Sequence, residues 1–100
     1  MKIVTFDDIN ESYMSGHESC YYHSGCDTKA DVAILDINSI FDYEEHKIAV
    51  CNDAFTSVAI IDEAGDFDAF KNFGITAWIK REDLSQLPNL LSDIQQRMGL

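Results

Sequence analysis

The sequence predicts an α/β domain: a small three-layer, doubly wound sheet of four to five mostly parallel strands with helices on both faces. Two observations predict it. Short apolar runs alternate along the chain with stretches of helical period. Three of these runs are apolar almost throughout, which is typical of strands buried on both faces of a parallel sheet. A length of 100 residues suits a single domain over 1–100.

The predicted strands are short and end at polar residues. Residues 2–6 (KIVTF) form the first, and residues 21–23 are a weaker candidate for an edge strand. The three apolar runs are residues 31–37, 57–61 and 75–79. Residues 10–19 contain Gly16 and few periodic apolar residues, so they predict only a poor helix. We therefore expect a fold that is abbreviated in its N-terminal third.

Helical periodicity accounts for the segments between the later strands. Residues 42–55 place Ile48, Cys51 and Phe55 on one face of a helix. Residues 67–73 repeat phenylalanine at every third position and stop before a glycine, which commonly follows the end of a helix. Both segments are expected to cover the sheet.

The last part of the chain carries the clearest amphipathic stripe. Its members are Leu84, Leu87, Leu91, Ile94 and Met98. Asp83 or Ser85 is the expected N-cap of this helix, and Pro88 lies in the first turn, where its missing N–H costs least. The stripe predicts a helix packed against the sheet.

Composition restricts the function. Seven Lys and Arg against 18 Asp and Glu give a net charge of −11, which repels a phosphate backbone, so direct nucleic-acid binding is not expected. No apolar run approaches the roughly 20 residues of a membrane-spanning helix, and no leader-like segment precedes the first strand. We therefore expect a cytoplasmic domain without membrane contact. The charge favours basic proteins or divalent cations as partners; the simpler interpretation is a surface that keeps the domain soluble.

A run of cysteines and histidines lies between the predicted strands over residues 2–6 and 31–37 and spans the weaker candidate over residues 21–23. His17, Cys20, His23 and Cys26 recur at every third position, and two imidazoles with two thiolates form a tetrahedral ligand set for zinc. The spacing is not that of a zinc finger, so a polar loop with two packed thiols is the alternative. Because the count of three cysteines is odd and no secretory leader is evident, we expect reduced thiols. Outside this run, His46 is expected to be an ordinary surface residue.

Polar residues collect where the predicted strands end. They are Asp7, Asp8, Asp36, Asn38, Asp62, Lys80 and Arg81. Parallel doubly wound sheets bind ligands outside the carboxyl ends of their strands, so these residues are expected to converge on one edge. Carboxylates held together repel one another, and Mg²⁺, which prefers oxygen ligands, relieves that repulsion. An aspartate at this edge is also a candidate nucleophile toward phosphorus. The alternative is that the acids only cap strand ends and add solubility.

Four segments together resemble the receiver domain of bacterial response regulators: KIVTFDD (2–8), ADVAILDIN (30–38), SVAIID (57–62) and GITAWIKREDL (74–84). The resemblance covers most of the chain and implies a flavodoxin-like fold. In receivers an acid pair after the first strand binds Mg²⁺, and the aspartate ending the third strand accepts a phosphoryl group. By this resemblance Asp7 and Asp8 match the acid pair. Asp36 matches the phosphoacceptor, and Asn38 the position whose backbone carbonyl contributes to the metal site.

Departures from the receiver pattern indicate a degenerate member. The chain between Asp8 and Asp36 is short. Asp62 stands where receivers carry a Ser or Thr whose hydroxyl touches the phosphoryl group, and a carboxylate there would repel phosphate. Receivers then carry a lysine. An ungapped alignment places Arg81 at that position, whereas a shift of one residue places Lys80 there, and the two residue types are not interchangeable at such a site.

The resemblance implies a stand-alone signalling and interaction module rather than an enzyme, with Mg²⁺-dependent phosphorylation of Asp36 as its only chemistry. A kinase or a regulatory target protein is the expected partner, and the chain is expected to be a monomer or a weak homodimer. Trp78, Ile79 and Lys80 lie on the strand that belongs to the partner-binding face of receivers, and they are the expected contact residues. The degenerate version, which binds its partner without a switch, is the one we favour.

Three other interpretations stay open. The segments SVAIID, FKNFG and ITAWIKREDLSQLPNLL are also similar to STAS-type domains such as anti-sigma-factor antagonists, which implies a regulatory binding domain. An acidic decoy, whose carboxylates imitate nucleic-acid phosphates and occupy a basic protein, fits the net charge. A metal-binding redox or storage protein would depend on residues 17–26 alone.

Overall fold

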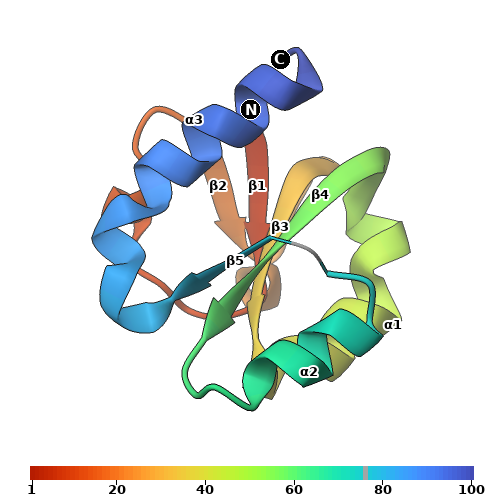
Figure 1. Ribbon diagram of the computed structural model, residues 1–100. Coiled ribbons are helices and arrows are strands. Elements are labelled where there is room, and N and C mark those ends of the chain that lie inside the picture. The colour runs from red at the N-terminus through yellow and green to blue at the C-terminus, as the bar shows by residue number, and fades with distance from the viewer. Residues whose placement is uncertain (76) are drawn as a thin grey trace.

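The computed structural model describes residues 1–75 and 77–100, and within them it contains a five-stranded, fully parallel sheet (Figure 1). The strands are β1 (Lys2–Thr5), β2 (Glu18–Tyr21), β3 (Ala30–Asp36), β4 (Cys51–Ile61) and β5 (Ala77–Lys80). Their order across the sheet is β2-β1-β3-β4-β5, and every neighbouring pair is parallel. This is the strand order of flavodoxin-like doubly wound folds. The predicted fold class is therefore confirmed.

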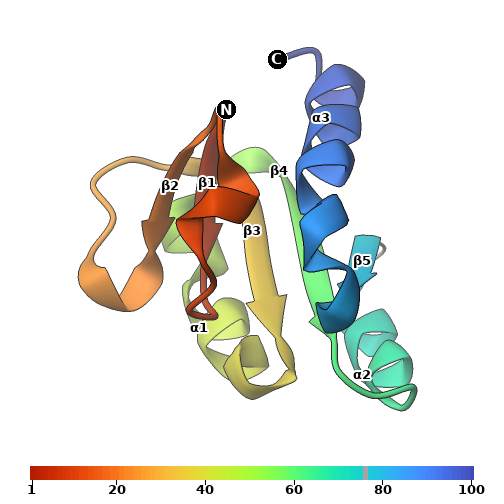
Figure 2. The ribbon, with the colours of Figure 1, turned by 90° about the vertical axis from the view of Figure 1, so that its left-hand side faces the viewer.

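Helices cover both faces of the sheet. Helices α1 (Ile40–Val50) and α2 (Asp66–Asn72) lie on one side, and α3 (Leu87–Met98) lies on the other (Figure 1). The short 3-10 helices are η1 (Glu11–Met14), η2 (Tyr22–Ser24), η3 (Ile37–Ser39) and η4 (Arg81–Gln86). Figure 2 shows the strands running in one direction, with both chain ends at the same end of the molecule. The carboxyl ends of the strands lie at the opposite end of the molecule.

Alternation of side chains along the strands builds one core on each face. On the side of α1 and α2, Leu35 of β3 packs in one cluster with Phe70 of α2. On the side of α3, Ile34 packs in a second cluster with Leu87 and Leu91. All five of these side chains are fully buried. Because both faces of β3 are covered, its sequence is apolar at nearly every position, which is the signal that predicted it.

The N-terminal third is abbreviated, as expected, but its elements differ from those predicted. A single 3-10 turn, η1, stands where residues 10–19 predicted a poor helix. Strand β2 ends at Tyr21, so the predicted strand over 21–23 is wrong beyond its first residue. Residues 22–24 instead form η2, and the chain leaves this turn at Gly25 with a φ of 90°, which favours glycine. An edge strand that is only partly covered carries few apolar residues, so its sequence signal is weak.

The predicted helix over 42–55 is wrong in its second half. Helix α1 ends at Val50, and the chain continues directly as β4, whose first residue, Cys51, pairs with Ala30 of β3. Cys51 is buried, as predicted, but Ile48 is 73% exposed. Apolar residues at i, i+3 and i+7 match the helical period by position alone. Cys51 and Thr56 nevertheless pair with Ala30 and Val32 of β3, with an irregular register between them, so this segment belongs to the sheet.

The middle elements lie close to their predicted bounds. Helix α2 begins one residue before residues 67–73. Strand β5 overlaps the predicted run over 75–79, of which residue 76 lies outside the described residues. Within the described residues, no helix combines the length and the apolar character needed to cross a bilayer.

The last helix is confirmed, but its start is not where the cap residues predicted. Asp83 and Ser85 lie inside η4, and the N-cap position of α3 is Gln86, which makes no capping side-chain bond. Pro88 occupies the first turn as predicted. Leu84 belongs to η4 and is still buried with the rest of the stripe, because a 3-10 turn continues the same face into the core.

Candidate functional site

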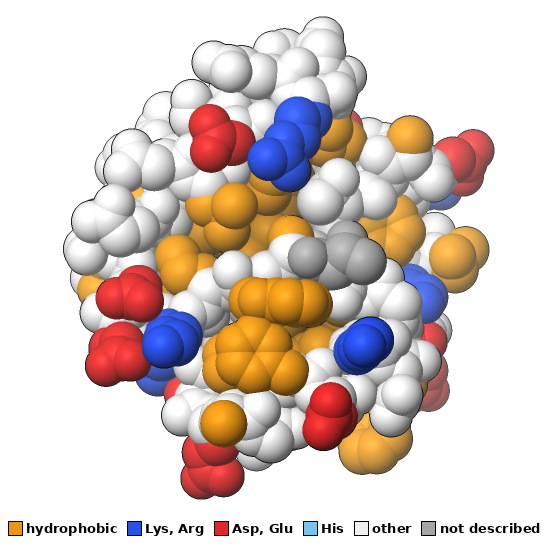
Figure 3. All heavy atoms as spheres, in the orientation of Figure 1, with side chains coloured by type: hydrophobic (Ala, Val, Ile, Leu, Met, Phe, Trp, Pro, Cys, Tyr) orange, Lys and Arg blue, Asp and Glu red, His pale blue; other side chains and the backbone are white. Residues whose placement is uncertain are grey.

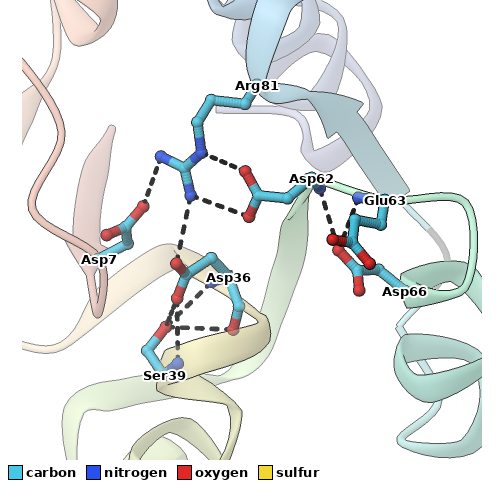
Figure 4. Close-up of polar contacts among 7 residues, drawn as sticks. All are labelled: Asp7, Asp36, Ser39, Asp62, Glu63, Asp66 and Arg81. Carbon is cyan, nitrogen blue, oxygen red and sulfur yellow. Dashed lines mark hydrogen bonds and ion pairs between the residues drawn. The ribbon is translucent and has the colours of Figure 1, made fainter.

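The carboxyl edge of the sheet brings three aspartates around one guanidinium (Figure 4). Asp36 is the last residue of β3, Asp7 and Asp62 lie just beyond β1 and β4, and Arg81 follows β5. These four strands are neighbours in a parallel sheet, so their carboxyl ends lie side by side. Residues far apart in the sequence therefore meet at one point.

Arg81 hydrogen-bonds to all three carboxylates. Its Nη1 donates to Asp7 Oδ2 at 3.0 Å, and its Nη2 donates to Asp36 Oδ2 at 3.2 Å. With Asp62 the contact is bidentate: Nε donates to Oδ1, and Nη2 donates to Oδ2 at 3.2 Å. Forked pairs of this kind are strong and fix the plane of the guanidinium. We call these four residues the Arg81 cage.

Asp36 is the most buried member of the cage, with 4% of its surface exposed. Its Oδ1 accepts hydrogen bonds from the backbone N–H and the hydroxyl of Ser39, at 3.0 and 2.7 Å. In return, the N–H of Asp36 donates to Ser39 Oγ at 2.9 Å, which completes a capping box at the start of η3. Since Oδ2 is bonded to Arg81, both oxygens of Asp36 have partners.

Charge pairing favours the ionised forms of Asp62 and Arg81. The hydrogen bond from Arg81 lowers the pKa of Asp62 below its ordinary value, and the same bond raises the pKa of Arg81 further above its own. Three carboxylates and one guanidinium leave a formal excess of two negative charges. Among residues 1–75 and 77–100, Arg81 is the only cation paired with these carboxylates.

The other predicted members of the site lie outside the cage. Asp8 and Asn38 are exposed, and in the described part of the chain neither side chain makes a polar contact. Lys80 is also exposed. Arg81, and not Lys80, contacts the carboxylates, so Arg81 is the one of these two residues that faces the site.

Two residues that position the cage were not anticipated. One is Ser39, described above. The other is Asp66, whose Oδ2 accepts hydrogen bonds from the N–H groups of Asp62 and Glu63 at 3.0 and 3.1 Å (Figure 4). This contact shapes the loop between β4 and α2 from which Asp62 reaches Arg81. The available signals were a hydroxyl three residues after Asp36 and an acid in the first turn of α2.

The structure corrects the expectation for the cysteines. Cys20 of β2 and Cys26, which follows η2, form a disulfide with their Cα atoms 5.8 Å apart, so reduced thiols are wrong for this pair. Cys51 is free, and burial raises the pKa of its thiol to about 11. An odd count could not reveal the pair, because pairing depends on distance in space. The turn η2 brings these two cysteines together.

The disulfide also removes the predicted soft-metal set. The two sulfurs are bonded to each other, and the two histidines have different partners. His17 Nδ1 lies 3.4 Å from the amino group of Met1, and burial together with that positive charge lowers its pKa. His23 Nε2 lies 3.2 Å from Asp42 Oδ2. These residues therefore do not form a tetrahedral ligand set in this structure.

The predicted contact residues lie on β5, at the edge of the sheet. Trp78 is 42% exposed and Lys80 is exposed, whereas Ile79 is turned into the core on the side of α3. The ring of Trp78 meets that of Phe67 edge-on, with centroids 5.2 Å apart. Figure 3 shows apolar side chains gathered on this face, and a shallow hollow there is lined in part by Phe67, Trp78 and Leu90. The surface is chemically suited to a protein contact.

Comparisons with family models, curated proteins and solved structures find no match to this chain. The topology and the site together define its class as a flavodoxin-like α/β domain with an acidic carboxyl edge closed by an internal arginine.

Proposed function

We propose that the chain is a degenerate receiver-like domain that binds a protein partner constitutively, without a phosphorylation switch. The observation that carries this proposal is the bonding of Arg81 to Asp7, Asp36 and Asp62 at once. Two of these aspartates match the metal-binding acid and the phosphoacceptor of receivers. The guanidinium therefore neutralises the acids that would otherwise hold Mg²⁺.

The donor set does not fit Mg²⁺ in this arrangement. Mg²⁺ needs near-octahedral oxygen ligands at about 2.0–2.1 Å. Oδ2 of Asp7 and Oδ2 of Asp36 already accept hydrogen bonds from Arg81, and Asp8 is exposed with no contact to the cage. A metal ion would have to displace a guanidinium that is held by four hydrogen bonds.

The two unusual residues of the site account for each other. A carboxylate at Asp62 and a guanidinium at Arg81 form a bidentate pair, which a lysine ammonium could not reproduce. By the resemblance, the Asp62 carboxylate stands where receivers place a hydroxyl against the phosphoryl group, so an incoming phosphoryl group would meet a negative charge there. Asp36, buried and bonded at both oxygens, is poorly placed to attack phosphorus. Both points support a binding role rather than phosphotransfer.

The proposed partner surface is the face of Trp78 and Lys80 on β5, with Phe67 beside them. A large aromatic that is 42% exposed and braced by a second ring is the kind of residue that anchors interfaces. The cage lies next to this surface, because Lys80 ends β5 and Arg81 follows it. Arg81 thus holds the end of β5 to three other strand ends.

The direct test is an amide NMR titration with Mg²⁺ and then with beryllofluoride, a stable mimic of the aspartyl phosphate. In the wild type, the amide chemical shifts of Asp7, Asp8 and Asp36 are expected to stay unchanged. In Arg81→Met the freed oxygens should bring Mg²⁺-dependent shifts to these positions, whereas Lys80→Met, which removes a neighbouring positive charge outside the cage, should behave as wild type. Wild-type shifts that spread from Asp36 to β5 with beryllofluoride would establish a working switch and overturn the proposal.

The acidic decoy is the rival that the net charge of −11 favours. Binding by a decoy would weaken steeply with salt and would not depend on Trp78. Binding through the β5 face should be lost in Trp78→Ala at every salt concentration. A pull-down of partners with the wild type and with Trp78→Ala, each at low and high salt, distinguishes the two functions.

A further inference from the structure

A second cluster of ligand-type side chains lies on α1, away from the Arg81 cage. Asp42, Glu45 and His46 each offer one donor atom, and these atoms all lie within 4.8 Å of one another. Positions i, i+3 and i+4 share one face of a helix, so the three side chains project from a single turn. We propose that this α1 cluster (Asp42, Glu45 and His46) binds a divalent transition-metal ion of the zinc class.

The donor set matches the chemistry of such ions. Imidazole nitrogen and carboxylate oxygen are both ligands of Zn²⁺, whereas Mg²⁺ and Ca²⁺ prefer oxygen alone. Ligands about 2.0–2.1 Å from a tetrahedral ion lie about 3.3 Å from one another. The donor atoms lie within 4.8 Å of one another and must come closer to reach this spacing. Since Glu45 is exposed and His46 and Asp42 are only partly covered, small rotations of these side chains suffice.

A second histidine stands beside the cluster on a different element. His23 of η2 has its Nε2 3.2 Å from Asp42 Oδ2. The ring of Tyr22 stacks on His46 with centroids 5.0 Å apart and meets His23 edge-on at 5.3 Å. Both imidazoles therefore pack against the same aromatic ring. His23 contacts Asp42 but is not among the three residues whose donor atoms lie within 4.8 Å of one another, so it would move closer to supply a fourth ligand.

Among residues 1–75 and 77–100, neither Asp42 nor Glu45 is paired with a lysine or an arginine. Lys47, the residue after His46, pairs with Glu44 at 2.9 Å, and its ammonium lies 5.2 Å from the centroid of the Tyr43 ring. The two carboxylates of the cluster would balance the charge of a divalent ion, and the net charge of −11 favours its approach. The turn carrying His23 is closed by the disulfide between Cys20 and Cys26, which restricts its conformations.

The test is calorimetric titration of the full chain, with its disulfide intact, using Zn²⁺ alone. One ion per chain is expected. His46→Ala and Asp42→Asn should each weaken binding more than tenfold, and His23→Ala by about tenfold. The matched control is His17→Ala, which removes a histidine bonded to the N-terminus and outside the cluster, and it should bind as wild type. Circular dichroism confirms that each variant is folded.

Amide NMR of the wild type then locates the ion. Shifts confined to residues 42–46 and 22–24 are expected. Absence of stoichiometric binding, or binding unchanged in His46→Ala, overturns the proposal. Binding that is lost in His17→Ala, or that needs reduction of the disulfide, would move the ion to the sulfur and imidazole run and also overturn it.

Discussion

The Arg81 cage and the α1 cluster both contain carboxylates, but they differ in the basic side chain that lies beside those carboxylates. The cage contains a guanidinium, which is always charged and is bonded to three acids at once. The α1 cluster contains the imidazole of His46, with His23 beside it, and an imidazole nitrogen binds a metal only when it is neutral. The acids of the cage are therefore paired with an arginine within the fold, whereas we propose that those of the α1 cluster bind an ion from solution. Acidic residues indicate a cation site only where no internal cation already occupies them.

The largest expected loss of stability comes from a substitution that touches neither cluster. Leu91→Ala removes a fully buried side chain of α3 and should lower the free energy of unfolding by about 2–5 kcal/mol. The loss should not depend on pH, because no charge changes. Urea unfolding at two pH values measures it. A loss below about 0.5 kcal/mol would mean that this stripe is not core.

Arg81→Met tests the cage itself. Removing the guanidinium leaves buried Asp36 beside two other unpaired carboxylates, and we expect a loss of about 2–3 kcal/mol. The figure is kept below that for a fully buried pair because the Arg81 side chain is 40% exposed. Acidification should restore part of the stability by protonating the acids, unlike in Leu91→Ala. Lys80→Met is the matched control and should change stability by less than about 0.5 kcal/mol; an equal loss in both variants would argue against the cage.

Much of this comparison could be anticipated from the sequence, and its limits are physical. The strand-end rule located Asp7, Asp36, Asp62 and Arg81 on one edge because parallel topology alone determines which ends meet. It could not say that one guanidinium contacts all three acids, or that Asp8 stays outside. Those facts depend on side-chain directions that are set by local bonds.

The fold shows the same division. Strand β3 was found because burial on both faces leaves a continuous apolar run. The first half of β4 was mistaken for helix because Cys51 and Phe55 fit both periods, and only pairing with β3 distinguishes them. The disulfide and the cluster around His46 join segments brought together by η2, an element without a strong sequence signal.

Removing the disulfide tests whether the α1 cluster depends on the turn that carries His23. The double substitution Cys20→Ser and Cys26→Ser releases a short loop and should cost about 2 kcal/mol in chain entropy. It should weaken Zn²⁺ binding by freeing the turn of His23, but less than His46→Ala does, because the ligands on α1 remain. Calorimetry and urea unfolding measure both effects. Zn²⁺ affinity equal to wild type would show that the disulfide does not position His23 for the ion.

The smallest expected effect is the pH dependence that Asp62 gives to the cage. Its pKa in the folded chain lies below the ordinary value of 3.8, chiefly because of the hydrogen bond from Arg81. The stabilisation is therefore complete above about pH 5 and is lost as the pH falls through 3.8 toward the folded pKa. Asp62→Asn should lower stability by about 1 kcal/mol at neutral pH, and the difference from wild type should shrink across that acidic window.

Asp53→Asn is the control for this measurement, because Asp53 is an exposed acid of β4, the strand that Asp62 follows, and its side chain has no ion pair among the described residues. Between about pH 2.5 and 7 its free energy of unfolding should equal that of wild type within experimental error. If the Asp62→Asn difference stayed constant down to the lowest pH, the contribution of Asp62 would be packing rather than charge. The forked pair with Arg81 would then be a contact of shape, and the internal cation would act mainly on Asp7 and Asp36.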